Sequence, residues 1–398
     1  MTACYHVGMI YLDYHATTPC DPRVVEAMLP YLTDQFANPH SDSHEAGRAA
    51  ADALAGATNL IAELVNTPAE SLLITSGATE SINLAMRGVM THPRNRRRKM
   101  IVAATEHPAV LDVAADLRQS GVEVVIIGTD RQGRVDPNEL AETVDEQTSL
   151  VNVMLANNEM GVITSIKQVA RIVHDAGALL HCDATQAVGR IPVDVRAMDI
   201  DLMSASAHKF YGPKGVGFLV AGNGQRRVRL RPQIVGGGQQ NGLRSGTMNP
   251  AGVIAMAKAL ELAIQSRTSE AIRIASLRNR LWAQLADAIE GLSLNGPELG
   301  DGSEDDQRLP GNLNFRLQHV EGESWMAATP AVAFSSGSAC SSADPTPSHV
   351  LTAIGLSESE ARRSVRFGIG RFTTQAEIDR ASDLLIAAHQ RLHRFPTR

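Results

Sequence analysis

One lysine of this sequence stands in a setting that is unusual for a surface lysine. Lys209 follows a stretch of small and hydroxyl-bearing residues (204–208, SASAH) and precedes a glycine-rich turn (212–217, GPKGVG). An amine held among small residues, near other cationic or desolvating groups, has a lowered pKa and can form a Schiff base with an aldehyde, which is how proteins anchor pyridoxal phosphate. The alternative is an ordinary surface lysine beside a turn.

Two further segments supply groups that such a coenzyme needs. Asp183 ends a β-type run, where a doubly wound sheet presents its ligand contacts, and a carboxylate there can keep a pyridine nitrogen protonated. Residues 75–81 (TSGATES) follow another such run and open a helix, so backbone N–H groups and the Thr79 hydroxyl can face a phosphate. Helix capping, by Asp183 in one segment and by Ser76 or Thr79 in the other, is the alternative.

Several weaker signals accompany these. Residues 157–159 (NNE) offer an amide to a ring oxygen, and residues 106–108 (EHP) offer an imidazole to lie over the ring, although a loop Asn or His is usually a turn or solvated residue. Arg366, in an alternating β-like run, can grip a carboxylate through two hydrogen bonds or form a surface salt bridge. Cys340 lies in a run of small residues (335–344), which predicts an accessible loop with a nucleophilic thiol. An incidental cysteine in a flexible loop is the alternative.

The elements that must position these residues form an α/β pattern. Short β-type runs occur at residues 71–74, 100–103, 122–127, 150–156, 178–182 and 202–204. Helical patterns at 81–90 and 166–176, with apolar residues three and four apart, separate several of them. This alternation predicts a mostly parallel sheet flanked by helices.

The rest of the chain has a different texture. Helices are predicted at residues 44–65, 250–265, 272–289 and 375–392, and a strand at 312–317. We expect residues 21–255 to form a large cofactor-binding α/β domain and residues 256–398 a small α+β domain that carries Cys340. Residues 1–20 are expected to join the small domain.

Composition excludes several classes of protein. The 398 residues exclude a single small module, and a net charge of −6 argues against nucleic acid as a direct partner. Two basic clusters, 94–99 and 226–231, are predicted to be solvated loops. Four cysteines without a C-x-x-C pair fit neither a disulfide framework nor a zinc site, which predicts a reducing, cytoplasmic location. No run approaches the roughly 18 apolar residues of a membrane span, so no membrane association is predicted.

Taken together, the motifs resemble those of the cysteine desulfurases of the NifS/IscS type. These are class V aminotransferase-like, fold-type I pyridoxal phosphate enzymes. The resemblance covers almost the whole chain and rests on LDYHATTP (12–19), NP (38–39), HEAGR (44–48), SGATES (76–81), NNEMG (157–161), DATQ (183–186), SAHK (206–209), RSGT (244–247), VEGES (320–324) and the Cys340 loop.

The resemblance implies a role for each site residue. Lys209 binds the coenzyme covalently, His107 stacks on its ring, and Asp183 pairs with its pyridine nitrogen. Asn158 and Gln186 contact the ring substituents. The residues implied to bind the phosphate are Ala78, Thr79, Ser206 and His208, with Thr247 reaching across from the second subunit of a homodimer.

The implied reaction takes sulfur from L-cysteine and releases L-alanine. L-Cysteine, held by Arg366 and Asn158, displaces Lys209 and loses its α-proton. The Cys340 thiolate, with Lys209 and His107 as the other catalytic residues, then attacks the sulfur, and the persulfide passes to an acceptor protein such as an iron–sulfur scaffold. No stable metal site is implied, and Cys340 is a candidate transient ligand of an iron–sulfur cluster.

Three segments depart from the family pattern. Residues 236–242 (GGGQQNG) lack a charged pair that the best-known members carry, the tail after Leu392 is short, and residues 326–330 interrupt a helix that the family usually continues. Two other functions stay open. One is another class V enzyme, an aminotransferase or a selenocysteine lyase, for which Cys340 is dispensable; the other is a non-catalytic binding subunit with the same fold.

Overall fold

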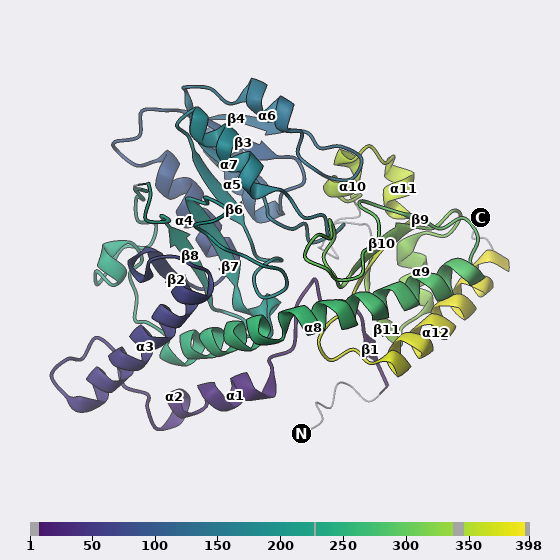
Figure 1. The fold of residues 1–398 in the computed structure, drawn as a ribbon, viewed down its shortest axis with the longest axis horizontal. Coiled ribbons are helices and arrows are strands. Elements are labelled where there is room, and N and C mark those ends of the chain that lie inside the picture. The colour runs from purple at the N-terminus through teal and green to yellow at the C-terminus, as the bar shows by residue number, and fades with distance from the viewer. Residues whose placement is uncertain (1–7, 227, 337–345, 395–398) are drawn as a thin grey trace.

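The computed structural model describes residues 8–226, 228–336 and 346–394, which form two lobes bridged by a long helix (Figure 1). The large lobe is built on a seven-stranded sheet in the order β2-β8-β7-β6-β5-β3-β4. Its strands are β2 (Leu72–Thr75), β3 (Lys99–Ala103), β4 (Glu123–Ile127), β5 (Thr148–Asn152), β6 (Leu179–Asp183), β7 (Leu202–Ser206) and β8 (Gly217–Ala221). Strands β3 to β7 pair in parallel, whereas β8 is antiparallel to both β2 and β7. The predicted α/β class and mostly parallel sheet are confirmed.

Helices cover both faces of this sheet. The helices of the large lobe are α1 (Pro22–Met28), α2 (Pro30–Thr33), α3 (Glu45–Leu64), α4 (Ala78–Met90), α5 (Pro108–Gln119), α6 (Pro137–Thr143) and α7 (Ile166–Asp175), of which α1 and α2 pack against the long helix that joins the lobes. On β3, Met100 packs with α4 and α5, whereas the next residue, Ile101, packs with α3 and α7. Successive strand residues point to opposite faces, so a strand covered on both sides is apolar throughout. This is why the sequence predicts β3, which is buried along its whole length.

The small lobe is built on a four-stranded antiparallel sheet in the order β12-β13-β10-β9. Its elements are β9 (Ser293–Leu294), β10 (Asn312–Arg316), α9 (Gly322–Ala328), β12 (Ser335–Ser336), α10 (His349–Ala353), α11 (Glu358–Arg362), β13 (Ser364–Gly368) and α12 (Gln375–Arg394). Strand β1 (Ile10–Tyr11) pairs in parallel with β11 (Val332–Ala333), so the start of the described chain lies against its C-terminal half. The residues at which one domain ends and the next begins stay a prediction.

One prediction about the helices is wrong. The segments 250–265 and 272–289 are a single helix, α8 (Pro250–Ala288), which runs from one lobe to the other. The polar residues between them do not end the helix, since they include neither Gly nor Pro and the hydroxyl of Ser266 donates to the carbonyl oxygen of Leu262 in the preceding turn. The first half of α8 packs in the core of the large lobe, with Leu260, and the second half in that of the small lobe, with Leu281.

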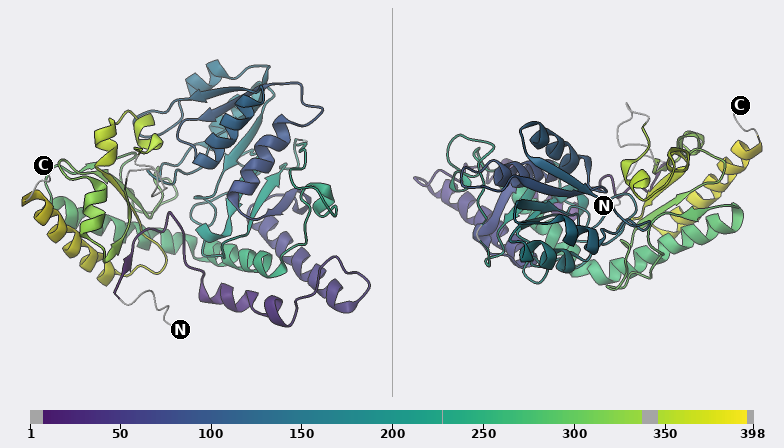
Figure 2. Two further views of the ribbon diagram at one scale, coloured as in Figure 1. Left: turned by 180° about the vertical axis from the view of Figure 1, so that it is seen from behind. Right: turned by 90° about the horizontal axis from the view of Figure 1, so that it is seen from above.

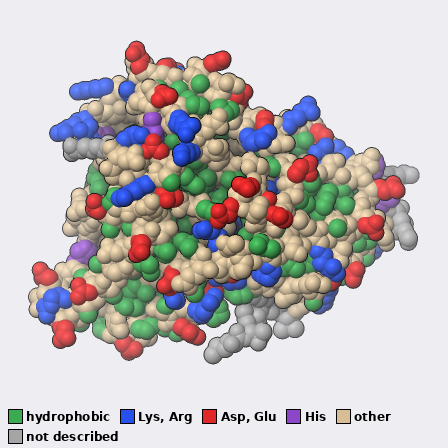
Figure 3. Space-filling model, viewed as in Figure 1, with side chains coloured by type: hydrophobic (Ala, Val, Ile, Leu, Met, Phe, Trp, Pro, Cys, Tyr) green, Lys and Arg blue, Asp and Glu red, His purple; other side chains and the backbone are tan. Residues whose placement is uncertain are grey.

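The described surface carries both charged and apolar side chains (Figure 3). None of the helices in the described part of the chain is long and apolar enough to cross a lipid bilayer. Acidic and basic side chains are interspersed over the face drawn in Figure 3. Helix α12 lies along the second half of α8, as both views of Figure 2 show.

Candidate active site

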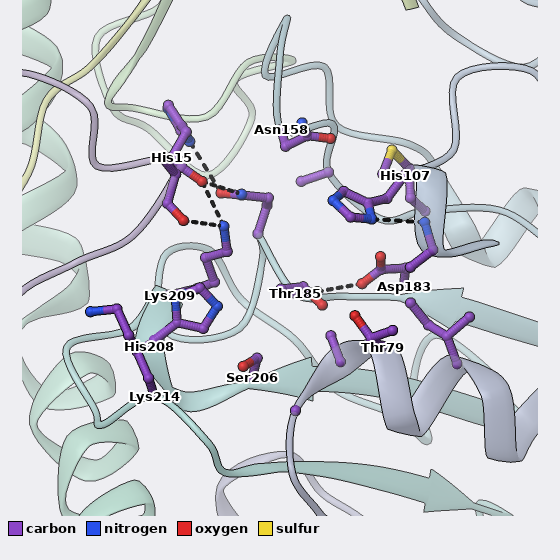
Figure 4. Close-up of a pocket in the computed structure, with 18 of the residues that line it drawn as sticks. His15, Thr79, His107, Asn158, Asp183, Thr185, Ser206, His208, Lys209 and Lys214 are labelled. Carbon is purple, nitrogen blue, oxygen red and sulfur yellow. Dashed lines mark hydrogen bonds between the residues drawn. The ribbon is translucent and has the colours of Figure 1, made fainter. Parts of the chain in front are cut away.

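A cavity of about 650 Å³ lies at the carboxyl ends of β6 and β7, between the large lobe and Arg366 of the small lobe. The predicted site residues that line it are Ala78, Thr79, His107, Asn158, Asp183, Gln186, Ser206, His208, Lys209 and Arg366. Thr79 and Ser206 lie at one end and Asn158 and His15 at the other (Figure 4). Parallel strands bring these distant segments together because their carboxyl ends meet at one edge of the sheet.

Lys209 ends the short helix η2 (Ala207–Lys209), which directly follows β7. Its Nζ donates hydrogen bonds to the carbonyl oxygens of His15 and Ala16, each at 2.7 Å. Burial, together with the positive charges of Arg190 and Arg366, lowers the pKa of Lys209 to about 7. A neutral amine has two N–H groups and one electron pair, so two carbonyl acceptors leave that pair available to a ligand. Lys209 is therefore not an ordinary surface lysine.

Asp183 and Gln186 lie at and just beyond the end of β6. Asp183 lines the cavity, and its Oδ1 accepts a hydrogen bond from the N–H of Thr185 (2.9 Å), so it also makes the local turn contact that capping predicts. The amide of Gln186 is fixed at both ends: Nε2 donates to the carbonyl of His15 (2.9 Å), and Oε1 accepts from Arg190 (2.8 Å).

The turn between β2 and α4 forms the other end of the cavity. Helix α4 begins at Ala78, directly after Gly77, and no side chain caps it, so the capping interpretation of residues 75–81 is wrong. Gly77 has a φ of 153°, which favours glycine, and a Cβ there would lie 3.5 Å from the hydroxyl of Ser206. Uncapped N–H groups at a helix N-terminus, beside the hydroxyls of Thr79 and Ser206, suit a phosphate.

Two imidazoles line the cavity in neutral form. His107 precedes α5, and its Nδ1 accepts a hydrogen bond from the N–H of Ala109 (3.1 Å), which leaves the proton on Nε2. Burial lowers the pKa of His107 below its usual value. For His208, burial and the neighbouring Lys209 and Lys214 lower the pKa to about 4. Both rings can therefore act as neutral hydrogen-bond donors at pH 7.

The structure distinguishes the two asparagines of the loop after β5. The side chain of Asn157 makes hydrogen bonds to main-chain groups. Its Nδ2 donates to the carbonyl of Thr105 (3.0 Å), and its Oδ1 accepts from the N–H groups of Glu159 and Met160. Asn158 lines the cavity instead. The side chain of Asn157 thus fixes the main chain of the loop that carries Asn158.

Arg366 reaches the cavity from β13 of the small lobe. It is buried, and its Nη2 donates to Oδ1 of Asp13 (2.7 Å) and to the hydroxyl of Ser335 (2.8 Å). Its Nη1 donates to the carbonyl of Asn158 (3.1 Å), while its buried Nε has no partner among the described residues. This guanidinium is therefore no surface ion pair, because it is buried where the two lobes meet and lines the cavity.

Comparison with known proteins decides the family. The family model described as aminotransferase class-V matches residues 10–381. The chain belongs to the class-V aminotransferase family. Relatives named cysteine desulfurase IscS include one from Anaeromyxobacter dehalogenans (strain 2CP-C), 47% identical over 94% of this chain and 90% of the relative, and one from Rickettsia rickettsii (strain Iowa), 42% identical over 96% of this chain and 92% of the relative.

Solved structures place this class-V chain in the same group. A NifS-like protein superposes with a TM-score of 0.88 at 32% identity, over 96% of this chain and all (100%) of that chain. The DndA protein of Streptomyces lividans superposes with a TM-score of 0.75 at 33% identity, over 89% of this chain and 97% of that chain. The resemblance to cysteine desulfurases of the NifS/IscS type and the fold-type I architecture are confirmed.

Two of the predicted site residues are not among the residues that line the cavity. Cys340 lies outside the described residues. Thr247 is exposed and does not line the cavity, so its role in the site of a second subunit stays a prediction.

Three residues that the sequence did not assign take part. Asp13, His15 and Ser335 line the cavity, and Asp13 and Ser335 bind Arg366. The only signal for them was the LDYHATTP motif and the run of small residues before Cys340.

Proposed function

We propose that this chain is a pyridoxal phosphate-dependent cysteine desulfurase that transfers the sulfur of L-cysteine to Cys340 and releases L-alanine. The observation that carries the proposal is Lys209, an amine with a pKa of about 7 in a cavity that also presents Asp183 and Arg366. The names of the curated relatives support the same activity.

The residues present fit the coenzyme in chemistry and number. Lys209 offers an amine to the aldehyde, Asp183 a carboxylate to the pyridine nitrogen, and Gln186 a fixed amide to the ring. His107 would stack on the ring. The uncapped start of α4 supports phosphate binding by Ala78, Thr79, Ser206 and His208. When bound, the coenzyme withdraws electrons from the bonds around the α-carbon of an amino acid.

The protein's own groups then bind and orient the substrate. The guanidinium of Arg366, which lines the cavity, binds the α-carboxylate through charge-assisted hydrogen bonds. Asn158 adds an amide on the same side. Lys209 moves the proton of the α-carbon, because an amine with a pKa of about 7 is present in both acid and base forms at neutral pH.

Residues on both sides of the Cys340 segment contact residues that line this cavity or directly precede one that does. Before it, the hydroxyl of Ser335 donates to Asp13 (2.9 Å); after it, Nε2 of His349 lies 2.8 Å from the carbonyl oxygen of Glu106. These contacts support delivery of the Cys340 thiolate to the substrate. The thiolate forms an S–S bond as the carbon–sulfur bond breaks, and the carbon skeleton keeps the electron pair and takes up protons to become alanine. The persulfide then passes to an acceptor protein such as an iron–sulfur scaffold.

The test replaces Cys340 and a matched cysteine. We expect Cys340→Ala to release no sulfide from L-cysteine under reducing conditions, whereas Cys20→Ala keeps the wild-type rate. Cys20 is a suitable control because it is partly buried and burial raises the pKa of its thiol, so it is a poor nucleophile. An aminotransferase or selenocysteine lyase would keep full turnover in Cys340→Ala. A non-catalytic subunit would purify without the visible absorbance of the coenzyme.

The same proposal includes a cytoplasmic homodimer. Exposed apolar side chains support a covered surface: Val235 is 80% exposed in the loop that leads to Thr247, and Phe36 is 76% exposed. The uncharged 236–242 segment is held firmly, since the amide of Gln240 bonds to both N and O of Ile74 on the edge strand β2 (2.7 and 2.9 Å). Sedimentation of the purified chain tests the dimer, and a monomer would contradict it.

A further inference from the structure

A guanidinium without a carboxylate partner lies directly behind Lys209. Arg190 donates to the carbonyl oxygen of Lys209 from Nη2 (3.1 Å) and Nε (3.3 Å), and to that of Tyr14 from Nη2 (2.7 Å). Its Nη1 donates to Nδ1 of His15 and to Oε1 of Gln186, each at 2.8 Å. All of these acceptors are neutral, and no ion pair of Arg190 occurs within the described ranges.

These bonds connect the coenzyme-binding side chains through one residue. Arg190 fixes the main chain of Lys209 and orients the amide of Gln186, whose Nε2 donates to the carbonyl of His15. The same carbonyl accepts from Nζ of Lys209 (Figure 4). Nδ1 of His15 lies between the guanidinium of Arg190, at 2.8 Å, and the amide oxygen of Gln186, at 3.1 Å. The network therefore holds the lysine at both its carbonyl and its amine.

Charged groups of both signs act on Lys209, and Arg190 is the cation among them that has no ion pair in the described ranges. Two cations, Arg190 and Arg366, and two carboxylates, Asp13 and Asp183, act on it. Asp13 is paired with Arg366, which leaves Arg190 as the cation that no adjacent carboxylate neutralises. Burial lowers the pKa of Arg190 to about 10, so it stays charged at pH 7.

The nearby imidazoles add no positive charge at pH 7. Burial lowers the pKa of each of the three rings close to Lys209, those of His15, His107 and His208. A nearby like charge disfavours the protonated form of an amine. The pKa of Lys209 is thus lowered by burial and by two guanidinium groups, of which Arg190 has the larger effect and Arg366 the smaller.

We propose that Arg190 is a positioning residue of this enzyme, which keeps the Lys209 amine unprotonated and aimed into the cavity for reaction with the coenzyme aldehyde. The inference rests on the proposed function, since it assumes that Lys209 is the residue that binds the coenzyme. That reaction forms a C=N bond and releases water, and only the unprotonated amine has the electron pair for it. Arg190 itself does not touch the reacting atoms.

The experiment measures capture of pyridoxal phosphate by the full-length chain after removal of bound coenzyme. The rate, followed by absorbance between pH 5.5 and about 9.5, is set by the unprotonated fraction of Lys209 and has its midpoint at the pKa of that amine. We expect a midpoint near 7 in the wild type and one about one pH unit higher in Arg190→Gln. Arg190→Lys keeps the charge but loses donors, so its midpoint stays near the wild-type value while its maximal rate falls.

The matched control is Arg278→Gln. Arg278 is also buried and donates to main-chain carbonyls, of Leu309 and Gly300, but it lies on α8 in the small lobe and does not line the cavity. Replacing Arg278 shows the effect of losing a buried guanidinium that is not close to Lys209. We expect a lower melting temperature and an unchanged midpoint.

The outcomes distinguish a failure of the proposed function from a failure of the proposed role of Arg190. If the wild-type chain captures no coenzyme at Lys209, the proposed function is wrong. If capture occurs and Arg190→Gln has the wild-type midpoint, Arg190 is only structural and the inference is wrong. Should Arg190→Gln not fold, Arg190→Met, which keeps the hydrocarbon stem, replaces it; if neither folds, the residue is structural and the inference is again overturned.

Discussion

The cavity and the core of the small sheet are both interior, but they are built from opposite chemistry. In the small sheet, Trp325, Phe315, Phe334 and Phe367 form one cluster whose ring centroids lie 4.6 to 6.2 Å apart. The indole N–H of Trp325 donates to the carbonyl of Leu385 (2.9 Å), so the cluster leaves no donor open. Around the cavity, by contrast, His15 Nε2, Glu106 Oε2 and Arg366 Nε are buried without a partner in the ranges described.

The aromatic cluster stabilises the folded chain, whereas the polar groups around the cavity serve the binding of a ligand. Apolar side chains contribute by burial and packing, with little dependence on pH. Buried polar groups without partners destabilise the folded chain, and they persist where a ligand is to complete them. The aromatic cluster offsets the cost of the cavity, so substitutions in the two regions should act in opposite directions on stability.

The strongest test of this contrast is Lys209→Met. We expect turnover to fall at least about a thousandfold, because the group that binds the coenzyme and moves the proton is removed. Without coenzyme, the variant should be more stable than the wild type below pH 7. The pKa of Lys209 is lowered from 10.5 to about 7, so protonation costs folding free energy in full below pH 7 and the cost disappears above 10.5.

Thermal or urea unfolding of the coenzyme-free chain across this pH range checks the prediction. The stability difference should shrink as the pH rises from 7 toward 10, by at most about 1.4 kcal/mol per pH unit. Lys258→Met, which removes a surface lysine paired with Glu261, serves as control and should change neither turnover nor stability measurably. A variant less stable than the wild type at pH 6 would break the contrast.

Sequence reasoning could locate the residues that end strands. Lys209 and Asp183 follow apolar runs that the sequence shows directly, and parallel pairing brings the ends of such runs together. The uncapped start of α4 was predictable on the same ground, since Gly77 stands between a strand and a helix.

Sequence reasoning could not locate the residues that hold Lys209 and its neighbours in place. Arg190 and His15 are 175 positions apart, and no periodicity in the sequence predicts that their two turns meet. The same limit explains the error in α8, where a polar interval suggested a break. That interval is the place at which the helix leaves one core and enters the other, a tertiary feature without a local signal.

The second test concerns the aromatic cluster. Trp325 is fully buried, and Trp325→Ala should lower the free energy of unfolding by about 3–5 kcal/mol at any pH between 6 and 9. Coenzyme affinity should change little in the folded fraction, because Trp325 does not line the cavity. Denaturant unfolding and coenzyme titration measure the two quantities. Trp325→Phe, which keeps most of the packing, is the milder control, and a loss of coenzyme affinity without a loss of stability would contradict the contrast.

A smaller effect should follow from Arg366→Lys, where the two lobes meet. A single ammonium cannot bind Asp13, Ser335 and the carbonyl of Asn158 at once and still meet a substrate carboxylate. We expect KM for L-cysteine to rise about tenfold with a smaller fall in kcat, equivalent to about 1.4 kcal/mol of binding. Steady-state kinetics measure both constants. An unchanged KM would show that Arg366 serves the lobe contact alone.

The smallest expected effect, and the finest test, comes from Glu106→Gln. Burial, aided by the charge of Asp183, raises the pKa of Glu106 well above its usual value, so the folded chain keeps a proton that the unfolded chain releases. The free energy of unfolding of the wild type should therefore fall as the pH rises above about 4.5. In the variant this fall should be less steep by up to about 1.4 kcal/mol per pH unit, which is the contribution of one proton. The slope is the quantity to compare, because the new amide keeps the acceptor for the N–H of Met154 but adds donors that need partners. Equal slopes in urea unfolding between pH 5 and 8 would mean that Glu106 is ionised in the folded chain, which would contradict the raised pKa.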